Sequence, residues 1–168
     1  MSNACVLFAL LCLPVPMGIT ATVPENGDLL SKIHIVAKVS PALAYLYTKS
    51  IVHHAKEYAI NPYLVSAIIY VESRYRNFLG ANDYGPMQVN GSWFKRLGIE
   101  KEDVLSIDGG IRTGTYILAL NRRANPHDPC WWSAYNSPNI TSRQLYEKRV
   151  LSALRKFGKN DDCGRTYE

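Results

Sequence analysis

Two places in the chain pair a polar residue with proline just ahead of an apolar stripe of helical period. Ser40-Pro41 and Asn61-Pro62 each offer a side-chain acceptor for a helix N-cap and a proline for the first turn, where its missing N–H is not needed. After Pro62, apolar residues recur at i, i+3, i+4 and i+7, the spacing of one buried helix face. They are Leu64, Ala67, Ile68 and Val71. These signals predict two successive helices and favour helix-on-helix packing.

The rest of the chain keeps a helical pattern around one polar loop. The stretch from Asn77 to Gly91 is rich in Gly, Asn and Asp, which predicts a loop. Residues 33–39 alternate like a strand yet fit a helix equally well, so residues 22–40 form a lead-in with two alternatives. Helices are expected over residues 41–58, after Pro62, and over residues 92–97, 108–123, 129–136 and 142–157. With 168 residues in all, the fold class is mainly α in a single domain.

The first 21 residues have the layout of a secretory signal peptide. They contain no Asp, Glu, Lys or Arg, and an apolar run from Val6 to Leu13 precedes small residues that end at Ala21. The positively charged n-region is missing, and a short buried or anchoring helix is the alternative. Because the apolar run is too short to span a bilayer comfortably, no stable membrane span is expected, and export to the periplasm or the extracellular space is the better interpretation. The predicted organisation is a signal peptide (1–21), the lead-in (22–40), the domain (41–158) and a polar tail (159–168).

Cleavage after Ala21 would leave Cys130 and Cys163 as the only cysteines. Two cysteines in an exported chain suggest one disulfide, with free thiols as the alternative. Neither a four-cysteine zinc site nor one of paired cysteines and histidines can be assembled at this spacing. His53-His54 followed by Glu57 does not match the H-E-x-x-H motif and is expected on an exposed helix face. No metal and no cofactor are therefore expected.

The formal net charge of +5 favours an anionic partner such as a cell wall, although many proteins without such a partner carry as much. Nucleic acid would need a denser basic patch with interleaved aromatic residues, and the sequence has none. No nucleic-acid partner is expected.

Glu72 is the strongest candidate for chemistry. It lies at the edge of the apolar stripe after Pro62, where partial desolvation would raise its pKa and keep a proton available near neutrality. A protonated carboxylic acid in a cleft is what cleavage of a glycosidic bond needs. The alternative is a glutamate at a helix end that pairs with Arg74 or Arg76.

Two segments farther along offer groups that suit a sugar ligand. Gln88 and Asn90 supply donors and acceptors for acetamido and hydroxyl groups, and Gly85 would let backbone approach a ligand closely. Tyr135-Asn136 adds a phenol and another amide. Taken alone, such loops are common turns. Three tryptophans could stack on sugars, but core packing is at least as good an interpretation for each; they are Trp93, Trp131 and Trp132.

Three motifs in order resemble the lytic transglycosylases of the soluble, goose-lysozyme-like (SLT domain) family. They are E-S-R-Y-R (Glu72–Arg76), G-P-M-Q-V-N (Gly85–Asn90) and A-Y-N (Ala134–Asn136), and the resemblance covers roughly residues 43–157. It implies a lysozyme-like domain that cleaves peptidoglycan glycan strands, without a cofactor. It also implies Glu72 as the acid/base catalyst, and substrate-binding roles for Ser73, Gly85, Met87, Gln88, Asn90, Tyr135 and Asn136.

Two departures from the family pattern concern the loop after Glu72. Pro86 stands where the family usually has leucine, which stiffens the loop and removes one N–H. The segment between Glu72 and Gly85 is shorter than usual, and a serine that commonly assists there has only Asn82 as a substitute.

The resemblance implies a mechanism with a single carboxylate. Glu72 would protonate the oxygen between N-acetylmuramic acid and N-acetylglucosamine, and then take the proton of the muramic 6-hydroxyl to close a 1,6-anhydro ring. The enzymatic alternative is a goose-type lysozyme with Asp83 as water-activating base, although Asp83 is by default a turn residue. The alternative from another class is a non-catalytic wall-binding subunit. Compact exported versions resemble the wall-opening enzymes that accompany secretion, conjugation or pilus machines.

Overall fold

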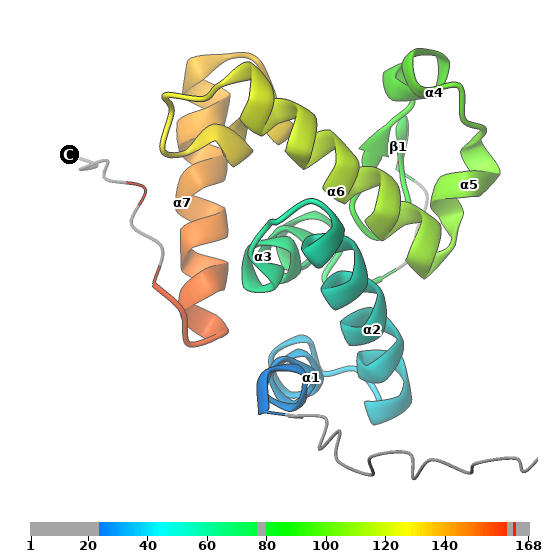
Figure 1. Cartoon of the computed structure of the whole chain (residues 1–168), viewed down its shortest axis with the longest axis vertical. Helices are drawn as coiled ribbons and strands as arrows, with labels where there is room; N and C mark the ends of the chain where they lie inside the picture. The colour runs from blue at the N-terminus through cyan, green and yellow to red at the C-terminus, as the bar shows by residue number, and fades with distance from the viewer. Residues whose placement is uncertain (1–23, 77–79, 161–162, 164–168) are drawn as a thin grey trace, which may run out of the picture.

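The computed structural model describes residues 24–76, 80–160 and 163, so the predicted signal peptide and most of the tail lie outside the described residues. The described part is mainly helical, as predicted, and also contains one small hairpin. No helix in it is long and apolar enough to cross a membrane. Figure 1 shows α3 near the centre, with α7 on one side and α1 and α2 below it. The elements are α1 (Pro24–Ala37), α2 (Pro41–Glu57), α3 (Pro62–Glu72), β1 (Asp83–Tyr84), β2 (Val89–Asn90), α4 (Ser92–Leu97), α5 (Lys101–Leu105), α6 (Ile107–Ala124), the 3-10 helix η1 (Trp131–Tyr135) and α7 (Ile140–Lys156).

The two polar–proline signals begin α2 and α3 as predicted. Ser40 Oγ accepts a hydrogen bond from the Leu43 N–H at 3.2 Å, and Asn61 Oδ1 accepts one from the Tyr63 N–H at 2.9 Å. Each cap satisfies a backbone donor that has no partner inside the helix. The caps therefore fix where both helices start.

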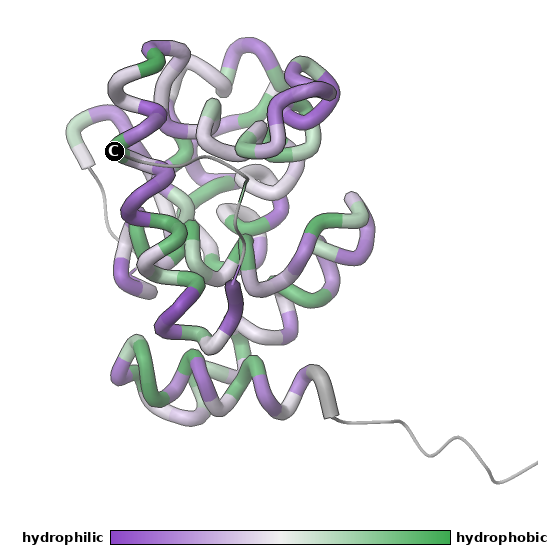
Figure 2. The backbone as a smooth tube through the Cα atoms, turned by 90° about the vertical axis from the view of Figure 1, so that its left-hand side faces the viewer, coloured by the Kyte–Doolittle hydropathy of each residue, from purple (hydrophilic) through white to green (hydrophobic). Residues whose placement is uncertain are grey.

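Residues 24–37 are helix α1, which decides between the two alternatives for the lead-in. Leu29 and Ile33, four residues apart, are buried and face α2 and α3, whereas Ile35 is 67% exposed. A strand would have placed residues 33 and 35 on the same face. Figure 2 shows hydrophobic and hydrophilic residues alternating along this helix at the bottom of the molecule.

Helix α3 forms the centre of the hydrophobic core. Seven of its residues, from Tyr63 to Ile69, are buried, and α1, α2 and α7 pack around it. A helix buried on all sides cannot shift without disturbing the core. The carboxyl end of α3, which carries Glu72, is therefore rigidly placed.

Two small elements were not predicted. Part of the expected loop is an antiparallel hairpin, in which Asp83 pairs with Asn90 and Tyr84 with Val89. Helix α5 has only five residues, of which Val104 alone is buried, and a capping box between Glu100 and Asp103 begins it. Neither a two-residue strand nor a five-residue helix is long enough to show a period.

A disulfide joins Cys130 and Cys163, whose Cα atoms are 5.1 Å apart, and attaches the tail to the start of η1. The two cysteines are 33 residues apart. For a loop of this length the chain-entropy model gives about 3–4 kcal/mol.

Reduction of this disulfide is expected to lower the free energy of unfolding by about 3–4 kcal/mol, because the reduced unfolded chain regains the freedom of the closed loop. Urea unfolding of residues 22–168, with and without reductant, measures the difference. A double variant, Cys130→Ser with Cys163→Ser, is the matched control and should behave like the reduced protein in both conditions. Equal stability of the oxidised and reduced proteins would contradict the prediction.

Candidate active site

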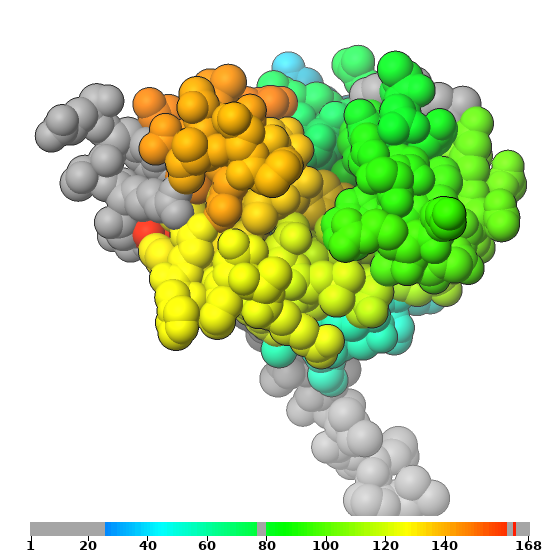
Figure 3. Space-filling view, turned by 90° about the horizontal axis from the view of Figure 1, so that it is seen from above, coloured from blue at the N-terminus to red at the C-terminus, as the bar shows by residue number. Residues whose placement is uncertain are grey.

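A cleft of about 860 Å³ opens on one side of the domain. Figure 3 shows this face hollowed between the hairpin–α4 region in green, the end of α6 in yellow and the start of α7 in orange. The carboxyl end of α3 and η1 complete the walls. Five residues predicted for the site line the cleft: Glu72, Gln88, Asn90, Tyr135 and Asn136.

Glu72 is the last residue of α3 and is partly buried in the cleft wall. Its Oε1 accepts a hydrogen bond of 2.5 Å from the hydroxyl of Tyr146, which is buried in α7. The bond crosses the α3–α7 contact, so both ends of it are held by packed helices. One carboxyl oxygen is thus fixed, and the carboxyl group faces the cleft.

Burial raises the pKa of Glu72 from 4.5 to about 7. The Tyr146 hydrogen bond and the charge of Arg149 act in the opposite direction, and the charge of Asp83 adds a smaller rise. Desolvation outweighs the hydrogen bond, so a large fraction of Glu72 carries a proton near neutral pH. This is the property that a general acid requires.

The arginines considered as partners for Glu72 have other positions. Arg74 stacks on the ring of Tyr70, with its guanidinium carbon 4.2 Å from the ring centroid, and Arg76 is exposed. No salt bridge of Glu72 is present among the described residues. The structure therefore favours the desolvated acid over the ion-paired glutamate.

Asp83 and Asn90 form the hairpin side of the cleft. They are opposite each other in the β1–β2 pair, and the Asn90 side-chain amide donates to Asp83 Oδ1 at 2.9 Å. The second carboxylate of the cleft is therefore oriented by an amide.

Tyr135 and Asn136 form the opposite wall. The Tyr135 hydroxyl donates to the backbone carbonyl of Met87 at 2.9 Å, which ties η1 to the loop before β2. Burial raises the pKa of Tyr135 well above its usual value, so the phenol stays protonated. Asn136 is exposed at the cleft edge.

Ser73, Gly85 and Met87 do not line the cleft; the structure places them buried behind it. Ser73 Oγ donates to the carbonyl of Pro86 at 2.7 Å, which fastens the loop to the end of α3. Gly85 has a φ of +72°, a conformation that glycine adopts without strain. From these positions the three residues can hold the cleft wall in place but do not face the cleft.

Met87 is fully buried against α6 at Gly114. A Cβ atom at residue 114 would lie 2.4 Å from the Met87 sulfur, so only glycine permits this contact without a shift. The close approach brings the Met87 backbone to Tyr135 and places Gln88 in the cleft.

Residues 49–150 match the family model of the transglycosylase SLT domain, which is more than half of the chain. The chain belongs to the transglycosylase SLT family. The match runs from within α2 to within α7 and includes every residue that lines the cleft. SLT domains act on peptidoglycan, generally outside the cytoplasm. No curated protein matches the chain.

Several residues of the SLT cleft were not predicted from the sequence. Asn121 on α6 lines the cleft, and its buried Nδ2 has no hydrogen-bond partner in the described part of the chain. Arg143 lies at the start of α7, where it donates to Ser133 Oγ at 2.9 Å and pairs with Asp128. No motif marks either residue, because each reaches the cleft only through the packing of its helix.

The three tryptophans have different environments in the SLT domain. Trp93 lines the cleft, and the guanidinium carbon of Arg96 lies 4.3 Å from the centroid of its ring. Trp132 is 1% exposed and belongs to the core, and Trp131 packs at the core edge. Of the three, Trp93 is the one placed to contact a sugar.

Proposed function

We propose that the chain is a peptidoglycan lytic transglycosylase that cleaves the β-1,4 bond between N-acetylmuramic acid and N-acetylglucosamine. The observation that carries the proposal is the carboxyl group of Glu72, which is desolvated, has a pKa of about 7 and faces a cleft lined with amides. Glu72 is its sole acid/base catalyst. The family match supports action on peptidoglycan in general.

In the first step Glu72 gives its proton to the glycosidic oxygen, and the bond from this oxygen to C1 of the muramic residue breaks. The bonding electrons leave with the oxygen, which becomes the new hydroxyl of the released sugar. The acetamido oxygen of the same muramic residue stabilises the electron-poor C1, since substrate assistance replaces a second carboxylate. The Tyr146 hydroxyl donates a hydrogen bond to Oε1 and so stabilises the carboxylate that forms on Glu72.

In the second step the carboxylate of Glu72 takes the proton of the muramic 6-hydroxyl, whose oxygen bonds to C1 and closes the 1,6-anhydro ring. Glu72 is then protonated again, so no water is consumed. The 6-hydroxyl belongs to the bound sugar, and such an intramolecular attack has a large effective concentration over free water.

The cleft offers polar groups to both sides of the glycan. Gln88 and Asn90 lie on the hairpin side, and Asn136 lies on the η1 side. The Nδ2 of Asn121, which has no partner among the described residues, would donate to an acceptor such as an acetamido carbonyl. We assign substrate positioning to these four side chains. Ser73, Gly85, Met87 and the Tyr135 hydroxyl are assigned to holding the cleft wall.

A goose-type lysozyme is the second candidate, because Asp83 shares the cleft with Glu72 and could activate water. The amide of Asn90 already bonds one oxygen of Asp83, which favours a role in holding the hairpin. A non-catalytic wall-binding subunit would not need a desolvated acid such as Glu72, because glycan binding alone requires no proton transfer.

The released muropeptides are expected to end in 1,6-anhydro-N-acetylmuramic acid, because the 6-hydroxyl outcompetes water. Mass spectrometry of fragments from purified peptidoglycan would show products one water lighter than lysozyme products, and these products would resist borohydride reduction. Asp83→Asn should only weaken the reaction. Reducing ends together with an inactive Asp83→Asn variant would make the protein a lysozyme.

The proposal extends to location and partners. Residues 1–21 act as a signal peptide, and residues 41–158 form the exported domain with its lead-in and polar tail. The substrate is the glycan strand of peptidoglycan in the periplasm or outside the cell, and a secretion, conjugation or pilus machine is the proposed partner. N-terminal sequencing of the exported protein tests the cleavage after Ala21.

A further inference from the structure

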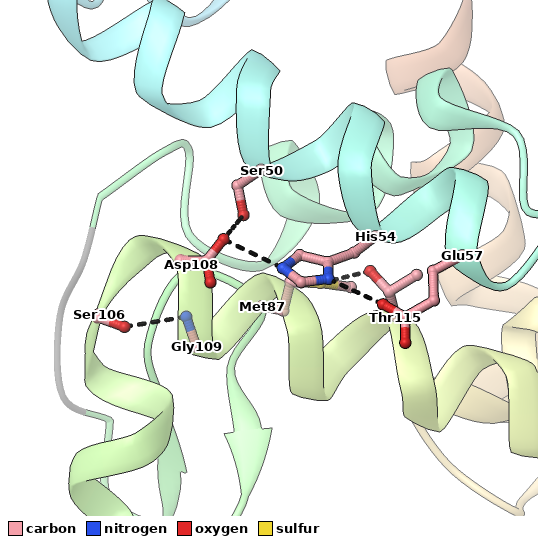
Figure 4. Close-up of polar contacts among 8 residues, drawn as sticks. All are labelled: Ser50, His54, Glu57, Met87, Ser106, Asp108, Gly109 and Thr115. Carbon is pink, nitrogen blue, oxygen red and sulfur yellow. Dashed lines mark hydrogen bonds and ion pairs between the residues drawn. The ribbon is translucent and has the colours of Figure 1, made fainter. Parts of the chain in front are cut away.

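A polar cluster between α2 and α6 plays no part in the cleft chemistry. His54 is 3% exposed, which contradicts the exposed helix face expected for it, although its neighbours His53 and Glu57 are exposed. Its Nδ1 lies 3.3 Å from Glu57 Oε2, and its Nε2 lies 3.1 Å from Asp108 Oδ1. Figure 4 shows the ring of His54 between these two carboxylates. His54 follows Ile51 by three residues and Tyr47 by seven, so helical spacing already places it on the buried face of α2. Its partner Asp108, 54 residues away, could not be inferred from the local sequence.

Each ring nitrogen of His54 faces a carboxylate oxygen, but the neutral ring carries a proton on only one of its two nitrogens. A neutral imidazole has a single N–H, which satisfies either Glu57 or Asp108 and turns the lone pair of the other nitrogen toward a carboxylate oxygen. A histidine nitrogen and a carboxylate oxygen that face each other at this distance are also a pair of ligand atoms that a metal ion can bind.

We propose that His53, His54 and Glu57 form a zinc site. Ligands at about 2.0–2.2 Å from a tetrahedral zinc ion are separated by about 3.4 Å, close to the 3.3 Å between His54 Nδ1 and Glu57 Oε2. The ligand atoms of all three residues lie within 4.8 Å of one another. His53 is exposed and can rotate its ring toward the ion.

Solvent supplies the fourth ligand. The side chain of Glu57 is 49% exposed, so the site is open to water on one side. Two imidazole nitrogens, one carboxylate and one water form a tetrahedral set that suits zinc. The ion would also lie at the carboxyl end of α2, where the helix dipole favours a cation.

The surroundings of His54 match those of a metal-bound histidine. With Nδ1 on the metal, Nε2–H donates to Asp108 Oδ1, and this oxygen also accepts a hydrogen bond of 2.8 Å from Ser50 Oγ. A carboxylate behind the ligating ring fixes the tautomer and the ring orientation. Asp108 sits in the first turn of α6, so the ion would hold the end of α2 against the start of α6. Its role would be structural, because none of the three ligands lines the cleft.

Zinc titration of the full exported protein, purified without a polyhistidine tag, tests the site by calorimetry. One equivalent of zinc should bind saturably and raise the thermal midpoint. His53→Ala and Glu57→Gln should each weaken binding at least about tenfold, since each removes one ligand at an exposed position. His127→Ala, which changes an exposed histidine outside the cluster, is the matched control and should leave binding unchanged.

Cobalt(II) gives a second readout that does not depend on activity. Bound at this site it should show the intense visible absorption of tetrahedral coordination, and Glu57→Gln should abolish the signal. The proposal is overturned by the absence of saturable zinc binding, by binding that survives both ligand variants, or by a weak octahedral cobalt spectrum. A protein that does not bind zinc but loses stability on Glu57→Gln would show that the contact between His54 and Glu57 serves the fold alone.

Discussion

Glu72→Gln is expected to lower the rate of peptidoglycan cleavage by at least about 100-fold and up to about 10,000-fold, the range for loss of general acid catalysis. The amide keeps the shape of the side chain, and its oxygen can still accept the hydrogen bond from Tyr146. It has no proton to give to the glycosidic oxygen and cannot take the proton of the 6-hydroxyl. Both steps of the proposed mechanism therefore stop.

The measurement is the release of soluble muropeptides from purified peptidoglycan, with pull-down on the same material to show that the variant still binds glycan. Glu102→Gln, an exposed acid on α5 outside the cleft, is the matched control and should leave the rate unchanged. Circular dichroism should show the same fold for both variants. A Glu72→Gln rate within a few-fold of the unaltered protein would remove Glu72 from the mechanism.

The longer helices could be predicted from the sequence because their signals are local. Ser40-Pro41 and Asn61-Pro62 mark the starts of α2 and α3, and the apolar spacing after Pro62 marks a buried face. For α1 the same kind of evidence was ambiguous, since the apolar residues between 33 and 39 fit both the period of a strand and the period of a helix. Packing of Leu29 and Ile33 on the core decides in favour of a helix, and this contact is not visible from local sequence.

The site could be predicted only as far as its motifs reach. Glu72 and the amides of Gln88 and Asn90 could be identified, because residue type and order suffice for them. Tyr146, which holds Glu72, is 74 residues away on another helix, and Asn121 reaches the cleft through the position of α6. Long-range packing supplies these residues, so no motif around Glu72 indicates them.

The same packing explains why a motif residue need not touch substrate. Met87 lies in the predicted G-P-M-Q motif, yet it is buried against Gly114 and presents only its backbone carbonyl to Tyr135. A conformation with Met87 in the cleft would leave a cavity beside α6, and such cavities are costly in a packed core. The motif therefore specifies the shape of the wall as well as its polar groups.

The pH dependence of cleavage follows from the pKa of about 7 for Glu72. Only enzyme with protonated Glu72 can act as the acid, so kcat/KM should be level on the acidic side and fall about tenfold per pH unit well above pH 7. Initial rates between about pH 5 and about pH 9 at constant ionic strength give the profile. Thermal midpoints at each pH separate loss of the proton from loss of the fold. A profile that stays level to about pH 9 would contradict the assignment.

The same pKa makes a prediction about stability with a definite sign. The pKa of Glu72 is raised in the folded state, so the folded protein binds more protons than the unfolded chain between pH 4.5 and about 7, and its stability falls as the pH rises through this range. The full effect of moving from 4.5 to about 7 is about 3 kcal/mol. Glu72→Gln does not titrate, so its stability relative to the unaltered protein should rise by about this amount between about pH 4.5 and about pH 8.

Urea unfolding of both proteins at the two pH values measures the change, with Glu102→Gln as control. A difference that is the same at both values would mean that Glu72 is not desolvated, and the physical basis of the proposed acid would be lost.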